Sequence, residues 1–211
     1  MGEPAIKNII FDLGGVFLDV DYNKTKQAFI DLGIANFNDF YQQSYSDPLF
    51  ARLEKGLIET DDFYNSFREI TGSHLTNKQI ATAWNAMMGS FRKCSVAILP
   101  GLKNRYNTYL LSNINDIHYR NFGQIFDREF GAGNFDDNFH KTYYSHLFHH
   151  RKPDAEAYEY VVRENGLVRE ATLFVDDTMK NIVAAADAGL RTLFLPKDTL
   201  VETLLMEYVA F

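Results

Sequence analysis

Four short segments of this chain place acidic, hydroxyl and basic side chains where apolar runs end. Asp12 follows IKNIIF, Ser112 ends NTYLLS, Asp176 and Asp177 follow ATLFV, and Lys152 lies in the segment RKPD. In an open α/β sheet, ligands bind outside the carboxyl ends of the parallel strands, so these side chains are expected to converge. Carboxylates bind Mg²⁺ and a lysine binds a phosphate oxygen. The set therefore predicts a site for a metal ion and a phosphoryl group.

Each segment also has a purely structural interpretation. An Asp before two glycines commonly forms a turn, and a Ser-Asn pair after a strand commonly caps a helix. A lone lysine is usually a solvated surface residue, and one of two adjacent aspartates can cap the next helix. The order of the four segments along the chain favours the functional interpretation.

The acidic positions offer both a nucleophile and a metal site. Asp12, before a glycine turn, can attack a substrate to form an aspartyl ester or an aspartyl-phosphate. The adjacent carboxylates of Asp176 and Asp177 repel each other unless a cation or a shared proton intervenes. An oxygen-rich set suits Mg²⁺ better than zinc, so the three histidines within residues 146–150 are interpreted as incidental.

The elements that position these residues form an alternating pattern. Strands alternating with helices indicate βαβ units, a parallel sheet and an α/β fold. The expected strands are residues 6–12, 107–112, 171–175 and 191–195, with a weaker one at 141–145. The expected helices between them are residues 115–126, 154–165 and 178–189.

Residues 17–95 interrupt this alternation with helical patterns. Those patterns lie near residues 24–32, 37–45, 60–71 and 76–89. Thr60 and Thr76 are the expected N-caps of the last two. The spacing of the apolar residues from Trp84 to Phe91 predicts packing along one helix. A short hairpin at 16–21 is the only strand expected here, so residues 17–95 are predicted to be a helical insertion.

The motifs resemble those of the haloacid dehalogenase (HAD) superfamily. The segments FDLGGVFLDVDYN, LEKGLIET, RKPDAEAY and FVDDTMKNIVAA are similar to those of sugar-1-phosphate phosphatases of the α-glucose-1-phosphatase type. They also resemble the phosphatase-like domain attached to some epoxide hydrolases. The resemblance implies a Rossmann-like parallel-sheet core made of residues 1–16 and 96–211, with residues 17–95 as a helical cap over the active site.

The resemblance also implies roles around the substrate. Asp12 would be the covalent nucleophile, and Lys152 would neutralise it and bind a phosphate oxygen. Ser112 would hydrogen-bond the phosphoryl oxygens, with Asn113 beside it. Glu54, in the LEKGLIET segment, would lie near the substrate.

Mg²⁺ is the cofactor that the resemblance implies. Its ligands would be Asp12, the carbonyl oxygen of Gly14 and Asp177. Asp176 would act through a water molecule or toward Lys152, and it is also the candidate base for the water that completes hydrolysis.

Gly14 departs from the pattern of the family. Most phosphatases of this superfamily carry a second Asp two residues after the nucleophile, where it protonates the leaving group and then activates water. Loss of such a general acid–base costs about 10²–10⁴-fold in rate if nothing replaces it. We therefore expect a preference for acidic leaving groups, such as the anomeric oxygen of a sugar 1-phosphate, and we do not expect a phosphomutase.

The composition limits the partners. Twenty-eight acidic residues against 21 basic residues give a net charge of −7, which argues against a general nucleic-acid binder. No run of the length of a membrane span and no targeting segment is expected, so a cytoplasmic location is predicted. A single cysteine, Cys94, excludes an internal disulfide bond, fits a reducing compartment and is expected to be buried.

These observations predict a Mg²⁺-dependent phosphomonoester hydrolase. Its substrate would be a small phosphorylated metabolite such as a sugar 1-phosphate, cleaved through an aspartyl-phosphate on Asp12. One alternative is a metal-free 2-haloacid dehalogenase that uses the same Asp and Lys. Another is a binding or regulatory protein with impaired catalysis, which Gly14 alone supports. The oligomeric state is not predicted.

Overall fold

A parallel sheet forms the centre of the molecule. The computed structural model describes residues 4–38, 48–131 and 133–210, and within them the strands form one five-stranded and one two-stranded sheet. The larger sheet has the strand order β5-β4-β1-β6-β7, and all its neighbouring strands are parallel. Its strands are β1 (Asn8–Phe11), β4 (Asn107–Ser112), β5 (Lys141–Tyr144), β6 (Thr172–Asp176) and β7 (Arg191–Phe194). The predicted α/β, Rossmann-like core is confirmed.

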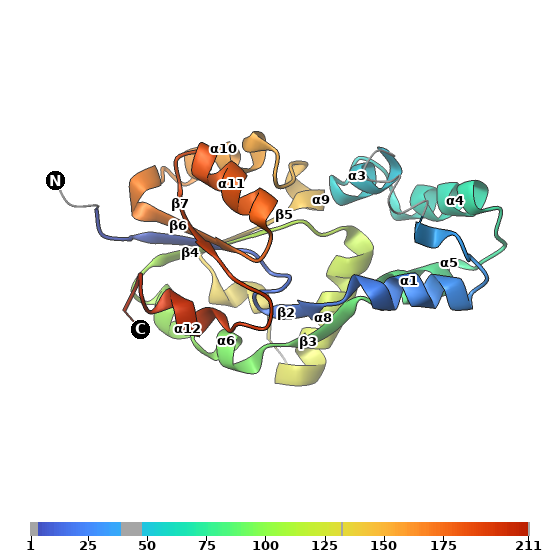
Figure 1. Ribbon diagram of the computed structural model, residues 1–211, viewed down its shortest axis with the longest axis horizontal. Helices are drawn as coiled ribbons and strands as arrows, with labels where there is room; N and C mark the ends of the chain where they lie inside the picture. Colours follow the sequence, from blue (N-terminus) through green and yellow to red (C-terminus); the bar gives the residue numbers. More distant parts are fainter. Residues whose placement is uncertain (1–3, 39–47, 132, 211) are drawn as a thin grey trace.

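Both faces of this sheet are covered, which explains why its strands are continuous apolar runs. Successive side chains point to opposite faces, so Ile9 and Phe11 belong to one hydrophobic cluster and Ile10 to another. Helices α10 and α11 cover one face, and α6 and α12 cover the other (Figure 1). The helices after residue 91 are α6 (Lys93–Ala97), α7 (Leu99–Lys103), α8 (Asp116–Phe130), α9 (Ser145–Phe148), α10 (Ala155–Glu164), α11 (Met179–Asp187) and α12 (Val201–Leu205). Two 3₁₀ turns lie at Phe135–Asn138 and Arg169–Ala171.

The strand register brings the candidate site residues to one edge of the sheet. Phe11 of β1 lies opposite Leu110 of β4 and Val175 of β6. The residues that follow or end these three central strands therefore stand side by side. The backbone N–H of Asp12 donates to the carbonyl oxygen of Val175 over 2.9 Å, which fixes Asp12 beside the end of β6.

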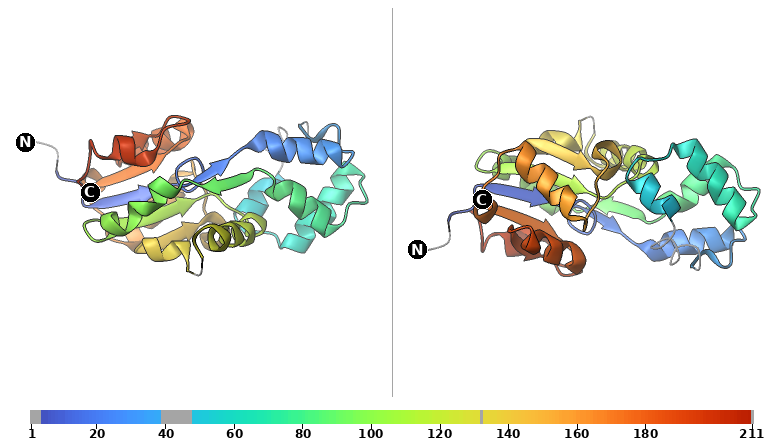
Figure 2. Two further views of the ribbon diagram at one scale, coloured as in Figure 1. Left: turned by 90° about the horizontal axis from the view of Figure 1, so that it is seen from below. Right: turned by 90° about the horizontal axis from the view of Figure 1, so that it is seen from above.

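A second group of helices lies beyond the carboxyl ends of these strands. Helices α1 (Tyr22–Asp31), α3 (Pro48–Glu54), α4 (Thr60–Thr71) and α5 (Asn77–Asn85) form this helical region, to the right in Figure 1 and in both views of Figure 2. It has a hydrophobic core of its own, rich in aromatic rings such as those of Phe29, Phe63 and Trp84. The expected helix at 37–45 lies mostly outside the described residues. The boundaries 17 and 95 stay a prediction.

Two antiparallel strands lead to and from the helical region. We call β2 (Leu18–Val20) and β3 (Met88–Phe91) together the ribbon. The predicted helix at 76–89 is wrong beyond Asn85, because residues 88–91 pair with β2 instead. The expected single helical stripe from Trp84 to Phe91 is therefore divided between α5 and β3.

The expected caps of two helices had different outcomes. Thr76 caps α5 in a capping box with Gln79, as predicted. Thr60 is not the cap of α4: Glu59 occupies that position, and the Thr60 hydroxyl donates to Oδ2 of Asp116 over 3.0 Å. Thr60 therefore joins the helical region to the start of α8.

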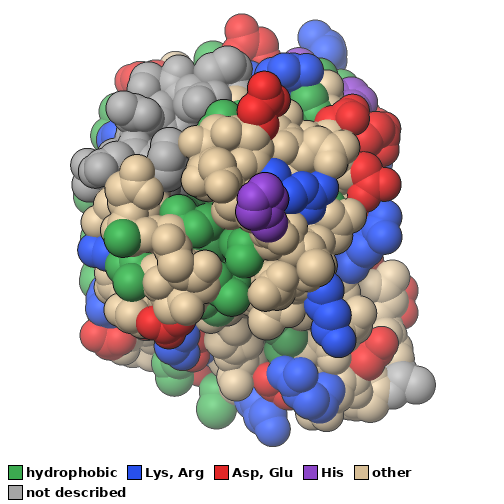
Figure 3. Space-filling model, turned by 90° about the vertical axis from the view of Figure 1, so that its right-hand side faces the viewer, with side chains coloured by type: hydrophobic (Ala, Val, Ile, Leu, Met, Phe, Trp, Pro, Cys, Tyr) green, Lys and Arg blue, Asp and Glu red, His purple; other side chains and the backbone are tan. Residues whose placement is uncertain are grey.

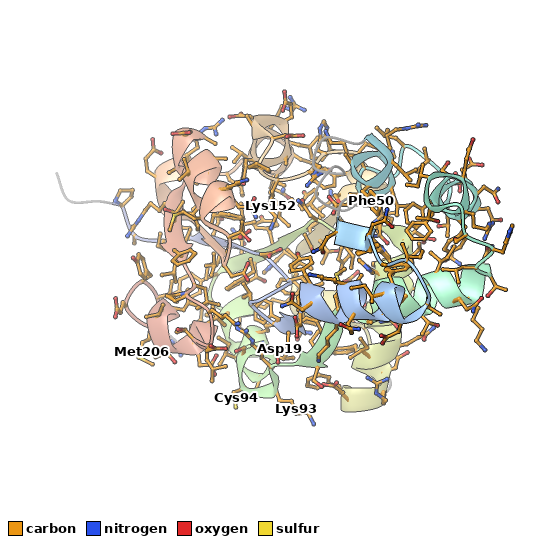
Figure 4. The ribbon with its side chains drawn as sticks, turned by 45° about the vertical axis from the view of Figure 1, so that its right-hand side comes forward. Asp19, Phe50, Lys93, Cys94, Lys152 and Met206 are labelled. Carbon is orange, nitrogen blue, oxygen red and sulfur yellow. The ribbon has the colours of Figure 1, made fainter. Side chains whose placement is uncertain are left out.

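The surface carries two further findings. Cys94 is exposed, contrary to the expectation of a buried thiol, because α6 turns its neighbours Ser95 and Val96 inward; Figure 4 shows Cys94 at the edge of the molecule. Figure 3 shows the end of the molecule formed by the helical region, where basic and acidic side chains surround one group of hydrophobic ones.

None of the helices in the described part of the chain has the length and hydrophobicity needed to cross a membrane.

Candidate active site

Lys152 lies at the centre of the site, enclosed between two carboxylates. Its Nζ is 2.7 Å from Oδ1 of Asp12 and 2.7 Å from Oδ2 of Asp176, and the side chain is 1% exposed. Figure 4 shows Lys152 in the interior, with Phe50 contributed by α3 of the helical region. A lysine deprived of water stays charged here because both neighbouring carboxylates raise its pKa and overcome the effect of burial.

Asn113 holds the backbone on both sides of Lys152. Its Oδ1 accepts from the Lys152 N–H over 2.9 Å, and its Nδ2 donates to the Lys152 carbonyl oxygen over 2.7 Å. Ser112, one residue earlier, is buried and lines the pocket. The end of β4 thus positions the lysine as well as the serine. A direct contact of Asn113 with substrate stays a prediction.

Asp176 is saturated with hydrogen bonds. Its Oδ1 accepts from the Thr178 N–H over 2.8 Å, and both of its oxygens accept from Nδ2 of Asn181 at 3.1 and 3.0 Å. Its Oδ2 also receives Lys152, and the side chain is fully buried. These contacts argue against the expected role of Asp176 as a base for water, since they engage both carboxylate oxygens. They favour the other expected role, toward Lys152.

Three carboxylates meet near one point. Oxygen atoms of Asp12, Asp176 and Asp177 lie within 4.8 Å of one another, and no other such cluster occurs in the part of the chain that the structure describes. Burial raises the pKa of Asp12 to about 7, against the opposing effect of the Lys152 ammonium. Burial also raises the pKa of Asp177, and Asp176 adds to that effect. Lys152 neutralises only one of the three negative charges, so the site fits a cation held by hard oxygen ligands.

The turn after β1 allows Asp177 to approach. A Cβ on Gly15 would lie 1.8 Å from Oδ2 of Asp177, and Gly15 has φ 70°. Only glycine satisfies both conditions. Gly14 is different: its φ is not positive, and a Cβ there would meet only Cγ2 of Val20, at 3.3 Å. The departure at Gly14 is therefore not imposed by the backbone.

A pocket of about 260 Å³ opens above these groups. One wall comes from the sheet and its loops, with Asp12, Ser112, Lys152 and Asp177, and the other comes largely from the helical region and the ribbon. The second wall is mainly apolar. Its side chains include Leu18, Val20, Phe50, Trp84, Met87 and Met88.

Glu54 is an acidic group on the apolar wall. It ends α3 and lies 3.1 Å from Nη2 of Arg151, the residue before Lys152. Burial raises the pKa of Glu54, and Arg151 opposes that effect. The structure therefore brings Glu54 to the pocket, as expected. Its contact with a substrate stays a prediction.

Further contacts join the end of α3 to residues 146–154, the segment that contains Lys152. Nζ of Lys55 lies 2.7 Å from Oδ2 of Asp154, and Nδ1 of His149 donates to the Lys55 carbonyl oxygen over 2.7 Å. A Cβ on Gly56 would lie 2.0 Å from the carbonyl oxygen of His146, so the two segments touch through backbone atoms. We call these contacts, with the Glu54–Arg151 pair, the α3 junction.

Sequence reasoning missed His118, which also lines the pocket. Its ring stacks on Trp84 with centroids 5.4 Å apart, and its Nε2 donates to the Trp84 carbonyl oxygen over 3.1 Å. Nδ1 accepts from Asn115, and burial lowers the pKa of His118 to about 4. The neutral ring thus joins α8 to α5. The one available signal was its position three residues after the cap Asn115, which places its ring on the first turn of the predicted helix.

Comparison with known proteins agrees with this arrangement. The family model of haloacid dehalogenase-like hydrolases matches residues 6–189. A D-ribitol-5-phosphate phosphatase of Bacteroides thetaiotaomicron is 31% identical over 195 residues, which cover 92% of this chain and 93% of that protein. A sesquiterpene phosphatase of Aspergillus oryzae is 30% identical over 198 residues and 90% of each chain.

A solved structure shares the whole fold. The crystal structure of a HAD family enzyme from Bacteroides thetaiotaomicron, in complex with magnesium and inorganic phosphate, superposes with a TM-score of 0.85. The two chains are 31% identical, and the match covers 95% of this chain and 99% of that one.

Proposed function

The chain belongs to the haloacid dehalogenase-like hydrolases, and from that premise we propose that it is a Mg²⁺-dependent phosphatase of a small sugar or polyol phosphate. The observation that carries the proposal is the Asp12–Lys152–Asp176 arrangement with Asp177 beside it, at the carboxyl ends of adjacent strands. The relatives described above, two phosphatases and an enzyme solved with magnesium and inorganic phosphate, support the same activity.

Asp12 is the nucleophile in the first half of the reaction. Its carboxylate attacks phosphorus, the bond from phosphorus to the leaving-group oxygen breaks, and an aspartyl-phosphate forms. Lys152 neutralises the nucleophile and a phosphoryl oxygen, and Ser112 donates to another. Asp176 holds the lysine in place. Water then attacks phosphorus and loses a proton to the solvent, the bond from phosphorus to the Asp12 oxygen breaks, and inorganic phosphate leaves with the Asp12 carboxylate restored.

The donor set fits Mg²⁺. Asp12, the Gly14 carbonyl oxygen and Asp177 would hold the ion, and hard oxygen ligands of this kind suit it. When bound, Mg²⁺ neutralises negative charge on the phosphoryl group. The clustered carboxylates also favour this proposal over the metal-free dehalogenase, which needs the Asp and the Lys but no third acid.

We further propose that residues 17–95 act as a cap that selects the leaving group. The apolar wall with Glu54 would face the part of the substrate beyond phosphorus. Within the class of sugar and polyol phosphates, Gly14 favours a sugar 1-phosphate, whose anomeric oxygen needs little protonation. The name of the Bacteroides relative points instead to a primary alkyl ester. A cytoplasmic location remains a prediction.

One experiment separates these possibilities. Initial rates are measured for a sugar 1-phosphate, ribitol 5-phosphate and p-nitrophenyl phosphate, each with Mg²⁺ and with EDTA. We expect turnover that EDTA abolishes, with the 1-phosphate faster than the 5-phosphate. Chloride release from a 2-chloroacid in EDTA would favour the dehalogenase. No turnover of any substrate, together with no adduct of beryllium fluoride and Mg²⁺, would favour the binding protein.

A further inference from the structure

Arg92 makes contacts that the proposed reaction does not use. It follows β3, where the chain returns from the helical region, and its side chain is 14% exposed. Nη1 donates to the carbonyl oxygens of Gly15 and Thr199, and Nε donates to Oδ1 of Asp19 over 2.8 Å. Its backbone N–H donates to the Phe17 carbonyl oxygen over 2.7 Å. One side chain thus joins three segments that are distant in the sequence.

The contact with Gly15 reaches the candidate metal site. Gly15 lies against the carboxylate of Asp177, and there is no room for even one carbon atom between them. The carbonyl of Gly14, a proposed ligand, is one peptide away. A contact that holds Gly15 in place therefore also holds the turn after β1 in its position relative to Asp177. Arg92 does this without being a ligand itself.

The contact with Asp19 reaches the ribbon. Asp19 is in β2, and a Cβ on Gly89 of β3 would lie 3.1 Å from Cβ of Asp19, so the two strands are closely packed at this point. An exposed ion pair alone contributes little to stability. The guanidinium, however, is mostly buried, and its Nε and Nη1 groups donate to three separate acceptors, which a lysine cannot reproduce.

We propose that Arg92 is a positioning residue for the metal site, which couples the ribbon to the turn that carries Gly14 and Gly15. This inference rests on the proposed function, because it requires that the site binds Mg²⁺. Bending of the ribbon changes the Arg92–Asp19 contact, and the same guanidinium transmits the change to Gly15. The geometry of the metal site then depends on how the helical region is placed.

The test is Mg²⁺ affinity measured by titration calorimetry without substrate, in the wild type and in variants of the full chain. Arg92→Met should bind Mg²⁺ about tenfold more weakly, equivalent to the loss of about one charge-assisted hydrogen bond. Arg92→Lys keeps the charge but not the three contacts, so its affinity should stay closer to that of Arg92→Met than to the wild type. Asp19→Ala should weaken binding about threefold.

Arg169→Met is the matched control. Arg169 also joins a carboxylate and a backbone carbonyl, those of Glu159 at 2.7 Å and Ala188 at 2.6 Å, but it precedes the opposite end of β6. Its Mg²⁺ affinity should equal that of the wild type. A kinetic readout adds a second criterion: saturating Mg²⁺ should restore most of the turnover of Arg92→Met.

Three results would overturn the inference. The first is wild-type Mg²⁺ affinity in both Arg92 variants, together with a loss of thermal stability no different from that of Arg169→Met. Arg92 would then be a structural residue only. Wild-type affinity in Asp19→Ala would remove the coupling to the ribbon. A wild-type protein that binds no Mg²⁺ would overturn the proposed function itself, a result distinct from any difference among the variants.

Discussion

The ammonium nitrogen of Lys152 lies 2.7 Å from Oδ1 of Asp12, at the base of the pocket, where the lysine side chain is only 1% exposed. Removing one partner of a buried ion pair normally leaves an uncompensated charge and strongly destabilises a protein. Here Lys152 keeps a second partner, Asp176, if Asp12 is replaced. Asp12 can therefore be replaced without leaving the buried Lys152 unpaired.

Asp12→Asn should be folded but inactive. The amide is a poor nucleophile, so turnover should fall by about 10⁴-fold or more, as when other catalytic groups are removed. Acid quench and mass spectrometry should detect an aspartyl-phosphate in the wild type and none in the variant. Asp127→Asn, on the exposed side of α8, is the control and should keep full activity. More than trace activity in Asp12→Asn would contradict a covalent mechanism.

Asp177→Ala should weaken the response to metal. Asp177 is a proposed ligand and touches the turn at Gly15, so half-saturation by Mg²⁺ should rise by about tenfold or more. Ser112→Ala removes a phosphate contact instead, and it should raise KM with little change in the Mg²⁺ requirement. Titrating Mg²⁺ against the rate of both variants distinguishes these effects. Equal Mg²⁺ responses in Asp177→Ala and the wild type would refute the ligand assignment.

Gly14→Asp should supply the missing general acid. The backbone conformation at Gly14 permits a side chain, because its φ is not positive, and a new Cβ would require only a small shift of the Val20 methyl group that lies 3.3 Å away. Rates for alkyl phosphates should rise, by up to about 10²-fold, while those for aryl phosphates change little. Gly14→Ala controls for bulk. If the chemical step limits the wild-type rate and that rate does not depend on the pKa of the leaving group, the proposed lack of a general acid is wrong.

Asp176→Asn should slow both halves of the reaction together. An amide in this position would direct N–H donors at Lys152 or Asn181, which are donors themselves, and so displace the lysine. A base for water would have the opposite signature, with phosphorylated enzyme accumulating after acid quench. Mass spectrometry of the quenched variant decides between them. We expect no accumulation.

His118 should make stability depend on pH. Its pKa in the folded protein is about 4, below the ordinary value of 6.5, so the unfolded chain binds more protons between these values. The contribution is present above pH 6.5 and is lost as pH falls toward 4, with a size on the order of 3 kcal/mol. Asp12, whose pKa is raised to about 7, contributes the opposite slope in this range, so the comparison is between proteins that share it. By urea unfolding, the free-energy difference between the wild type and His118→Gln should be larger at pH 7.5 than at pH 5, whereas that for exposed His74→Gln should be the same at both; a pH-independent difference for His118→Gln would contradict the assignment.

The strand ends were predictable because local signals and tertiary packing agree there. The apolar runs before Asp12 and Asp176 are buried on both faces, so length and composition alone identified them. The parallel order then placed the chemistry at one edge. Lys152 and Glu54 were placed by motif resemblance, and the structure brings both to the pocket.

The failures involve partners far away in the sequence. Met88 and Phe91 have helical spacing from Trp84, and only pairing with β2, about seventy residues earlier, makes them a strand. The hydroxyl of Thr60 binds Asp116, and the guanidinium of Arg92 binds Gly15. No local pattern encodes such contacts. A residue's neighbours along the chain do not reveal which distant segment it will meet.

The α3 junction has a consequence for the lifetime of the bound product. The helical region is joined to the sheet covalently through the ribbon, as Figure 1 shows. The contacts at the α3 junction, by contrast, include the ion pairs Lys55–Asp154 and Glu54–Arg151. These pairs are partly exposed, so dissolved salt screens them. We therefore expect product release to become faster as ionic strength rises, so that the residence time depends on the surrounding electrolyte as well as on the protein.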